Sequence, residues 1–596
     1  METLPRSTHS PFLCRKYSNF HSPSKTVKSR TSFIVSSGGV HRSRITRELQ
    51  HQQGIRKTQS RTPSLQAHAQ PSLLEKVFST LDRAIINFID PPLHLSVDAN
   101  YILSDNFAPV DELSPTQCIV HGSIPPCLDG VYIRNGPNPQ FPPSGPHHYL
   151  DGDGMVHSVK ISDGRATFCS RYVKTNKYLF EHHAKSYIVP KVIGVGMLGL
   201  APFVSRAALF IARVLSGQYD VGNGIGVANT SLAFLGGSLY ALCEGDLPYA
   251  IKVRDDGDII TLGRHSFDGK LTMNMTAHPK FDPDTKEAFS FRYSPTPPYL
   301  TYFWFDENGN KQPDVPIFSM KQLSLTHDLA ISKKYAIMFD VQLGTDIKNL
   351  IVGKPLVNVD HTKVPRIGVL QRYAKDESSM KWFEVPGFNI FHVVNAWDET
   401  DKHGGEVVVL VAPKISSMEH FVDRVDLVQA SMEKIAIHLQ TGVVSRETLS
   451  ADYNLEFPVI NPAYVSKKNK YVYAAMAEKT PMKSRMVRTM GVAKVGISQQ
   501  EDNTYLDEHI VAVRTFGDNC FGGEPFFVAR EPENPCSEED DGFIVSFVHN
   551  ESRGESRFVV MDARSPTLEI VASVTLPQRV PYGLHGIFVR DKDIDQ

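Results

Sequence analysis

The sequence predicts an all-β fold, and three observations carry this prediction. Short segments rich in β-branched and aromatic residues follow one another over about 450 residues, and turns such as 306–309 separate them. Little of this stretch has helical periodicity. Hydrophobic residues make up 41% of the chain and charged residues 21%, as in globular proteins. A β-propeller accommodates so many strands best, because radial repetition leaves few free sheet edges.

The strands expected within this stretch share β-branched and aromatic composition and lie between turn residues. They are residues 130–136, 238–245, 334–341, 406–412, 470–477, 542–550, 557–563 and 568–576. No WD or kelch repeat is visible, so spacing alone does not fix the number of blades.

The N-terminal segment 1–70 has a different composition. It is rich in Arg, Lys and Ser, and its acidic residues are Glu2 and Glu48. Basic, Ser-rich and acid-poor character at an N-terminus is typical of a plastid or mitochondrial transit peptide. A merely disordered basic tail is the alternative interpretation.

Two later segments are predicted to be helical. In segment 71–95, Ser72 and Glu75 form a capping-box pattern before an amphipathic stretch, and Pro91-Pro92 ends it. Segment 185–216 is strongly apolar, but glycines, Pro202, Arg206 and Arg213 interrupt it. A membrane-spanning helix needs about 20 apolar residues without charge, so dipping into one leaflet, with the arginines reaching the head groups, fits better. A buried core helix is the alternative.

Several classes of partner are excluded by composition and context. Lys plus Arg is 63 and Asp plus Glu is 65, so no basic excess indicates nucleic acid. Gly194, Gly196 and Gly199 match a dinucleotide fingerprint, but no strand–helix alternation follows them, so no nucleotide cofactor is expected. The seven cysteines are scattered and predict neither a zinc site nor a disulfide framework.

Four of the 23 histidines lie in apolar, strand-like contexts. They are His278 in MTAHPKFDP, His327 in LTHDLAIS, His392 in FNIFHVVNAW and His585 in PYGLHGIFV. A single histidine is more often a core or surface residue than a ligand, but an unpaired buried imidazole is unfavourable. Because the inner strands of a propeller converge on one axis, these distant residues can meet there.

Three glutamates lie in equally apolar contexts: Glu244 in LYALCEGDLPY, Glu456 in LEFPVINP and Glu524 in FGGEPFFV. A buried carboxylate needs a partner, and a metal-binding histidine usually donates its second N–H to a carboxylate. The three glutamates are therefore candidates to accept hydrogen bonds from the histidines and to orient their rings. Each one taken alone is more simply a structural or surface residue.

These contexts together resemble the carotenoid cleavage dioxygenase family over nearly everything after the transit segment. Residues 130–139, GVYIRNGPNP, and 147–159, HHYLDGDGMVHSV, look like its N-terminal signature. The four His contexts align with its iron ligands, and the three Glu contexts with the carboxylates that support them. GVGMLGLAPFVSRAALF, LEFPVINP and PYGLHG are most similar to the plant plastoglobule subfamily, usually numbered four. His157, inside the signature, is not assigned as a ligand.

The resemblance implies a seven-bladed propeller with a helical dome, formed by residues 96–596. It implies that segment 185–216 dips into a membrane beside the tunnel mouth, and that the helix in 71–95 also associates with a membrane. The expected location is a plastid, at plastoglobules or thylakoids.

The resemblance also implies one Fe(II) per chain, held by four neutral imidazoles that leave two octahedral positions open. O2 is the co-substrate and is activated at the iron, with no separate side-chain acid or base. No flavin, nicotinamide or 2-oxoglutarate is expected, because the carotenoid or apocarotenoid supplies the electrons.

The expected reaction cleaves the 9,10 and/or 9',10' double bond and gives an ionone-type ketone and an apocarotenal. Phe391 and Leu584, each adjacent to an expected ligand, are candidates for lining the substrate tunnel, with ordinary core packing as the alternative. The nine-cis-epoxycarotenoid subfamily typically has Phe at the position of Leu584. The alternatives are 9-cis-epoxycarotenoid cleavage and a non-catalytic carotenoid-binding protein of plastid lipid droplets.

Overall fold

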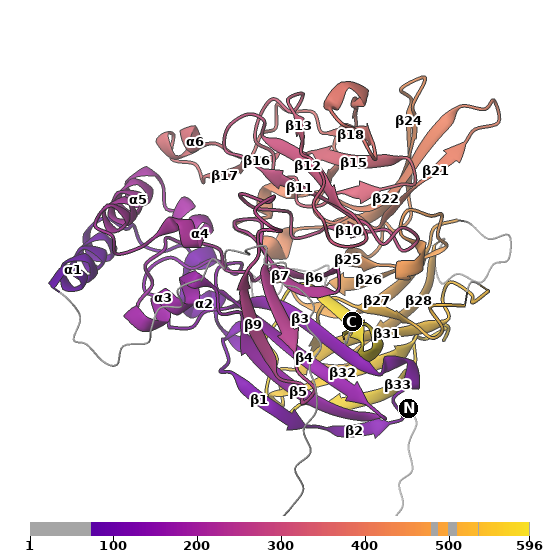
Figure 1. The fold of residues 1–596 in the computed structure, drawn as a ribbon, viewed down its shortest axis with the longest axis horizontal. Helices are drawn as coiled ribbons and strands as arrows, with labels where there is room; N and C mark the ends of the chain where they lie inside the picture. The colour runs from indigo at the N-terminus through magenta and orange to yellow at the C-terminus, as the bar shows by residue number, and fades with distance from the viewer. Residues whose placement is uncertain (1–72, 478–486, 499–508, 535, 595–596) are drawn as a thin grey trace, which may run out of the picture. The chain divides into compact units, whose positions relative to one another are not determined.

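The strands are grouped into antiparallel blades, each built from a nearly continuous stretch of chain (Figure 1). The computed structural model describes residues 73–477, 487–498, 509–534 and 536–594. The predicted transit segment 1–70 and the capping residue Ser72 lie outside the described residues.

Seven blades, numbered in chain order, can be counted in the described part of the chain. Blade I consists of β1 (Leu113–Gln117), β5 (Arg165–Tyr172), β4 (Asp153–Ser162), β3 (Gly130–Asn138) and β34 (Gly586–Arg590). Blade II consists of β6 (Ser231–Leu235), β7 (Ser238–Leu242), β8 (Tyr249–Val253) and β9 (Ile259–Arg264). Blade III consists of β10 (Lys280–Phe281), β11 (Ala288–Tyr293), β12 (Leu300–Phe305) and β13 (Val315–Ile317). Blade IV consists of β14 (Ala330–Ile331), β15 (Tyr335–Asp340), β18 (Arg366–Gln371) and β19 (Lys381–Glu384).

The remaining blades follow the same plan. Blade V consists of β20 (Asn389–Ile390), β21 (Asn395–Thr400), β22 (Glu406–Ile415), β23 (Ala430–His438) and β24 (Val444–Thr448). Blade VI consists of β25 (Asn454–Val459), β26 (Tyr471–Ala477), β27 (Thr489–Gly496) and β28 (Ile510–Thr515). Blade VII consists of β29 (Cys520–Gly522), β30 (Phe526–Ala529), β31 (Gly542–Asn550), β32 (Glu555–Asp562), β33 (Ile570–Thr575) and β2 (Ile119–Gly122). A single pair between β27 and β29 joins blades VI and VII, and β16 (Leu343–Thr345) and β17 (Val357–Val359) form a separate ribbon.

The two ends of the chain close the ring. Strand β34, near the C-terminus, pairs with β3 in blade I, while β2, near the N-terminus, pairs with β33 in blade VII. Each junction therefore ties the first part of the propeller to the last by backbone hydrogen bonds, and few edges are left free.

Seven hydrophobic clusters fill the spaces between successive blades, including the space between VII and I. Strand β22 shows why its sequence is a continuous apolar run. Val408 and Leu410 pack toward blade IV, whereas Val407 and Val409 pack toward blade VI. Successive side chains of a strand point to opposite faces, and both faces of this strand are covered. The closed set of clusters confirms the all-β propeller prediction.

The helices are α1 (Leu73–Phe88), α2 (Ala99–Ile102), α3 (Asn176–Ala184), α4 (Val192–Gly196), α5 (Leu200–Leu215), α6 (Ile347–Ile351) and α7 (Asp591–Ile594). Single 3-10 turns cover Leu95–Val97, Asp105–Phe107, Pro126–Leu128, Val221–Asn223, Glu377–Ser379, Met418–His420, Val425–Leu427 and Pro462–Tyr464. Figure 1 shows α1, α3, α4 and α5 together on one side of the blades. Within segment 185–216 the helix breaks at Gly199, whose φ of +91° favours glycine. Pro202 lies in the first turn of α5, where its missing N–H leaves no bond unmade.

Helices α1 and α5, called the helix pair below, pack against each other. Phe78, Ile85 and Leu209 form the buried contact between them. Asp90 bonds to both terminal nitrogens of Arg206 at 2.5 Å, and Asp82 pairs with Arg213. Within the described residues, no helix combines the length and apolar character that crossing a membrane requires.

Candidate metal centre

Each of the four expected histidines lies at the beginning of an inner strand. His278 precedes β10, His327 precedes β14, His392 lies between β20 and β21, and His585 immediately precedes β34. They therefore come from blades III, IV, V and I. The propeller brings them together because its innermost strands all run beside one axis.

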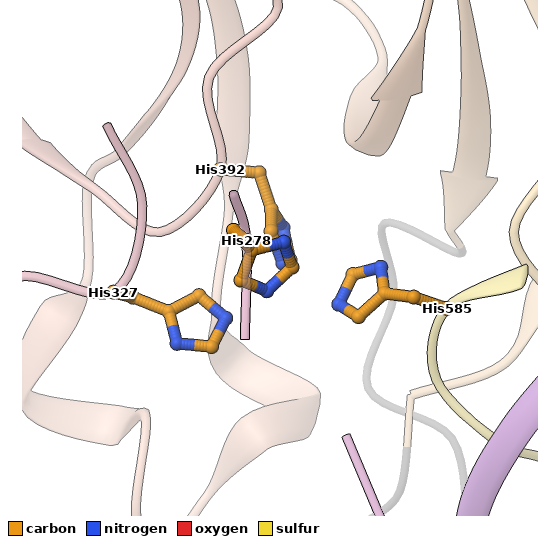
Figure 2. Close-up of side chains that lie close together, drawn as sticks. All are labelled: His278, His327, His392 and His585. Atoms are coloured by element: carbon orange, nitrogen blue, oxygen red, sulfur yellow. The ribbon is translucent and has the colours of Figure 1, made fainter. Parts of the chain in front are cut away.

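The four imidazoles converge on one point, as Figure 2 shows. One nitrogen from each ring lies within 4.8 Å of the corresponding nitrogens of the other three. The ring centres of His278 and His327, and of His278 and His585, are 4.4 Å apart. Two nitrogens bound to one ion at about 2.1 Å lie at most about 4.2 Å apart, so small ring movements suffice to hold one metal ion. We call this group of four histidines the metal centre, because it is the candidate site for a metal ion.

Each of three histidines has a carboxylate beside its Nδ1 atom. Oε2 of Glu456 accepts from His392 at 2.6 Å, and Oε1 of Glu524 accepts from His585 at 2.9 Å. Oε1 of Glu244 lies 2.5 Å from Nδ1 of His327, an ion-pair contact in which the two atoms are not aligned as in a hydrogen bond. A carboxylate at Nδ1 fixes the ring and leaves Nε2 for a metal.

His278 differs from the other three, because no carboxylate pairs with it among the residues that the structure describes. Its backbone is held instead. The Thr276 hydroxyl accepts from the His278 amide at 3.0 Å and donates to the His327 carbonyl at 3.1 Å. One side chain thus links the segments that carry two of the imidazoles.

The electrostatics of the centre favour the neutral form of two imidazoles, those of His278 and His585. Burial, reinforced by His585 and the other rings, lowers the pKa of His278 well below its ordinary value. Burial also lowers the pKa of His585, although Glu524 opposes it. At His392 burial acts in the same direction, but Glu456 outweighs it and raises the pKa. Metal ions bind the neutral form, and carboxylates partly offset the charge of an ion.

The unpaired polar atoms of the centre provide a test of whether a metal fits. Nε2 of His278 and Nε2 of His392 are buried and have no hydrogen-bond partner among the residues that the structure describes. Leaving such atoms without any partner is unfavourable, whereas a metal ion at the common point would satisfy both. Imidazole nitrogen suits Fe, Zn, Cu and Ni, so the donor set fits a transition metal.

The segment around His585 depends on two glycines. A Cβ on Gly583 would lie 2.6 Å from the guanidinium carbon of Arg134, and one on Gly586 would lie 2.5 Å from the Tyr132 hydroxyl. The backbone beside His585 can lie this close to blade I only without side chains there. This explains why the sequence GLHG has glycine at positions 583 and 586.

The two tunnel candidates have different surroundings. The ring of Phe391 lies 4.6 Å from that of His327 and stacks on Phe421 at 3.9 Å. It also packs against the hydrophobic cluster between blades IV and V. Leu584 is half-buried, and its amide donates to the Asn135 carbonyl at 2.9 Å.

Sequence reasoning missed Phe457, whose ring centre lies 5.2 Å from that of His392 and 5.4 Å from that of His585. Its φ is +50°, and the register of β25 against β26 shifts between Glu456 and Val459. Bulges of this kind re-aim side chains near functional sites, and a bulky residue at positive φ is strained. The pattern LEFPV gives no sign of either feature. His157 lies in β4 and is not among the four histidines whose nitrogens converge.

Comparison with known proteins agrees with this geometry. Residues 107–590 match the RPE65 family, described as retinal pigment epithelial membrane protein. The chain is 54% identical over 530 residues to a protein of Arabidopsis thaliana named probable carotenoid cleavage dioxygenase 4, chloroplastic, covering 88% of this chain and 87% of that protein. The chain belongs to the RPE65/carotenoid cleavage dioxygenase family. Members of this family are oxygenases, so the protein is an enzyme.

Two further relatives carry names for different reactions. 9-cis-epoxycarotenoid dioxygenase NCED1, chloroplastic, of Oryza sativa subsp. japonica is 51% identical over 87% of this chain and 80% of its own length. The zeaxanthin 7,8(7',8')-cleavage dioxygenase, chromoplastic, of Crocus sativus is 49% identical over 63% of this chain and 99% of its own length. The plastid names agree with the predicted location, and the protein is a plastid protein.

Solved structures share the fold. The crystal structure of the lignostilbene dioxygenase of Pseudomonas brassicacearum matches with a TM-score of 0.69 and 22% identity, covering 82% of this chain and 98% of that one. The cobalt-substituted apocarotenoid oxygenase of Synechocystis matches with a TM-score of 0.63 and 25% identity, covering 83% and 99%. Both cover nearly the whole described propeller.

Proposed function

We propose that this protein is an Fe(II) dioxygenase that cleaves the 9,10 and/or 9',10' double bond of a carotenoid or apocarotenoid, giving an ionone-type ketone and an apocarotenal. One observation carries the proposal: four imidazoles from four blades converge within 4.8 Å of one another. His278, His327, His392 and His585 would hold one iron per chain, and Glu244, Glu456 and Glu524 would orient three of them.

Iron suits this reaction better than the other metals that imidazole binds. Bound Fe(II) supplies the redox capacity that O2 chemistry on a conjugated chain requires, which Zn(II) lacks. The protein's own side chains would bind the iron, orient the imidazoles and shield the site from water. Burial lowers the pKa of His278 and of His585 and so favours the neutral form that binds a metal. Phe391 and Leu584 would line the path along which the polyene reaches the centre. The register of the polyene in that path selects the bond.

The test is product analysis. Protein loaded with Fe(II) is incubated under O2 with β-carotene, zeaxanthin, an apocarotenal and a 9-cis-epoxycarotenoid in separate reactions. We expect an ionone-type ketone from β-carotene. Labelled O2 adds a second readout: both carbonyl products should carry one labelled atom when they are reduced before exchange with water. Metal-free protein is the control.

Two other reactions are distinguished by the same experiment. The relative named for 7,8 cleavage of zeaxanthin motivates one alternative, and its products differ in length from those of 9,10 cleavage. The relative named for 9-cis-epoxycarotenoids motivates the other. Cleavage of zeaxanthin at 7,8 without any 9,10 product, or turnover of the 9-cis-epoxycarotenoid alone, would contradict the proposed reaction and leave the iron centre standing.

The proposal also assigns the helix pair to a plastid membrane or plastoglobule surface. Leu73, Phe88 and Leu215 are each more than 80% exposed there. A groove of about 420 Å³ between the helices is lined by Leu81, Ala84, Ile85, Phe88, Ile89, Ser205, Ala208, Leu209 and Ala212. Outward apolar surface of this kind marks membrane or protein contact. Flotation with galactolipid vesicles tests it: binding is expected, and its absence would contradict the assignment.

Segment 1–70 would act as the transit peptide. Its basic, Ser-rich and acid-poor composition and the plastid location support this role. Sequencing the N-terminus of protein purified from plastids tests it, and a mature chain that still begins at Met1 would contradict it.

A further inference from the structure

A fourth carboxylate lies among the histidine-bearing segments and touches none of the rings' Nδ1 atoms. Asp328 directly follows His327 and is 2% exposed. Its Oδ2 atom accepts from the Lys280 ammonium at 2.8 Å and from the Val393 amide at 2.9 Å. Its Oδ1 atom accepts from the Leu329 amide at 2.7 Å.

The partners of Asp328 belong to the segments that carry three of the four imidazoles. Lys280 lies two residues after His278 in blade III, and Val393 directly follows His392 in blade V. Asp328 itself is beside His327 in blade IV. One side chain therefore joins three blades at the positions where their histidines point inward.

The chemistry of this junction requires a charged acceptor. A buried carboxylate is unfavourable unless several donors satisfy it, and bonds from an ammonium and from amides to a carboxylate are stronger than neutral ones. An asparagine at this position has one acceptor oxygen. If that oxygen replaces Oδ2, it still accepts from Lys280 and the Val393 amide, but it carries no charge, and the NH2 group then faces the Leu329 amide, which is also a donor. If the NH2 group replaces Oδ2 instead, the bonds to both neighbouring blades are lost. In either orientation the junction loses at least one bond, and the bond to the Lys280 ammonium loses its charged acceptor.

The junction matters most for His278. Its ring has no carboxylate partner among the described residues, whereas Glu244, Glu456 and Glu524 support the other three rings. Its position depends on its backbone, which Thr276 holds on one side and Lys280 on the other. A metal site needs its ligands within about 0.5 Å of the productive geometry.

We propose that Asp328 is a positioning residue that holds the segments of His278, His327 and His392 in register and thereby sets how tightly the centre retains its metal. This inference rests on the proposed function, because it requires that the centre bind a metal ion. Asp328 does not contact the substrate or the metal itself. Its effect reaches the centre through the backbone of its neighbours.

The test compares Asp328→Asn with a matched control, Asp282→Asn. Asp282 is also buried, at 3% exposure, and its carboxylate also joins blades, through Arg372 at 2.6 Å and the Ser466 hydroxyl at 3.2 Å. Asp282 is four residues from His278, beyond the end of β10, and binds no residue adjacent to an expected ligand. A general loss of packing would affect both variants alike.

Metal retention is the primary readout. Each protein is loaded with Fe(II) without O2, and transfer of the iron to a chromogenic chelator is followed over time. We expect Asp328→Asn to release iron at least about tenfold faster than the wild type, and Asp282→Asn to release it at the wild-type rate. Equal rates for the two variants would overturn the inference.

Co(II) supplies a readout that a merely structural role would not change. The visible absorption of bound Co(II) depends on ligand geometry, so the spectrum should shift in Asp328→Asn and stay unchanged in Asp282→Asn. An unchanged spectrum in both would overturn the inference. If wild-type protein binds neither Fe(II) nor Co(II), the proposed function itself fails, which is a distinguishable result.

Lys280→Met keeps the test decisive if Asp328→Asn does not fold. Lys280 is partly exposed, and its replacement removes only the arm to the His278 segment. Loss of one charge-assisted bond should speed iron release by about threefold or more. Release at the rate of Asp282→Asn would overturn the inference.

Discussion

The metal centre gathers imidazoles and carboxylates inside the propeller, whereas the helix pair carries aliphatic and aromatic side chains outward. At the centre, His392 and His585 are 9% and 8% exposed. On the helix pair, Phe88 and Leu215 are 85% and 83% exposed. Each arrangement is unfavourable without a partner. Buried polar atoms that make no hydrogen bond cost free energy, and so does apolar surface that stays exposed to water.

The proposed function gives the two regions different partners. An ion would satisfy the polar atoms that converge in the buried site, and a lipid phase would cover the apolar side chains that point outward from the helix pair. The two regions also differ in how they are held. The centre is fixed by backbone segments from four blades, whereas the helix pair is fixed by a small apolar contact and two ion pairs.

Removing one imidazole should have the largest effect. We expect His392→Ala to abolish both iron binding and carotenoid cleavage, because three ligands remain and Glu456 is left buried without its partner. Iron content and product formation are the measurements. His438→Ala is the control, since His438 also faces a carboxylate, Asp401 at 3.6 Å, but lies outside the centre. Cleavage at the wild-type rate in His392→Ala would remove the basis of the proposed centre.

Neutralising the supporting carboxylates should give graded losses. The side chains of Glu524, Glu456 and Glu244 are 10%, 19% and 30% exposed. Less water at a carboxylate makes its bond to the imidazole stronger. We expect Glu524→Gln to reduce iron affinity by about 10- to 100-fold, with smaller losses for Glu456→Gln and then Glu244→Gln. Competition with a chelator measures the iron affinity of each variant. The reverse order of affinities would show that the burial of a glutamate does not determine how much it contributes to iron binding.

Apolar exposure on the helix pair should control membrane binding without touching the centre. Phe88→Ser should weaken partition into galactolipid vesicles about tenfold, because burying a phenyl ring is worth about 1.5 kcal/mol or more. Turnover of detergent-solubilised substrate should not change. Phe318→Ser is the matched control, since Phe318 is 54% exposed and lies outside the helix pair. Equal losses in the two variants would mean that general hydrophobicity, not this face, drives binding.

The local features of this molecule could be predicted from its sequence. Apolar runs such as 406–412 predicted strands, and histidines in apolar contexts marked the segments that the blades bring together. Contacts between segments far apart in the chain could not be predicted from the sequence. The pairing of Glu456 with His392 depends on which blades are neighbours, and the junction at Asp328 depends on three segments that only meet in the closed ring.

Two local features were also beyond sequence reasoning. The register shift that aims Phe457 at the metal centre depends on how β25 pairs with β26, which no residue type in LEFPV announces. The break between α4 and α5 falls at Gly199, yet Gly194 and Gly196 in the same segment are helical. The residue type alone does not distinguish a helical glycine from one that ends a helix.

The ion pair at the end of α1 should have the smallest effect on the enzyme and the clearest effect on the helix pair. The side chain of Asp90 is 4% exposed and binds Arg206 through both oxygens. Removing one partner of a buried pair is more harmful than replacing both by apolar groups. Asp90→Asn should therefore release α1 from α5, whereas Asp90→Leu combined with Arg206→Met should restore the contact.

Hydrogen exchange measures this prediction directly. The amides of α1 should lose protection in Asp90→Asn and regain it in the double variant, while the propeller strands keep theirs in both. Turnover of solubilised substrate should stay at the wild-type rate, because the blades hold the histidines without help from α1. If protection of α1 survives in Asp90→Asn, then Phe78, Ile85 and Leu209 hold the helix pair by themselves. Apolar packing would then hold the helix pair together, as it does the blades, and the ion pair of Asp90 with Arg206 would not be needed to keep α1 against α5.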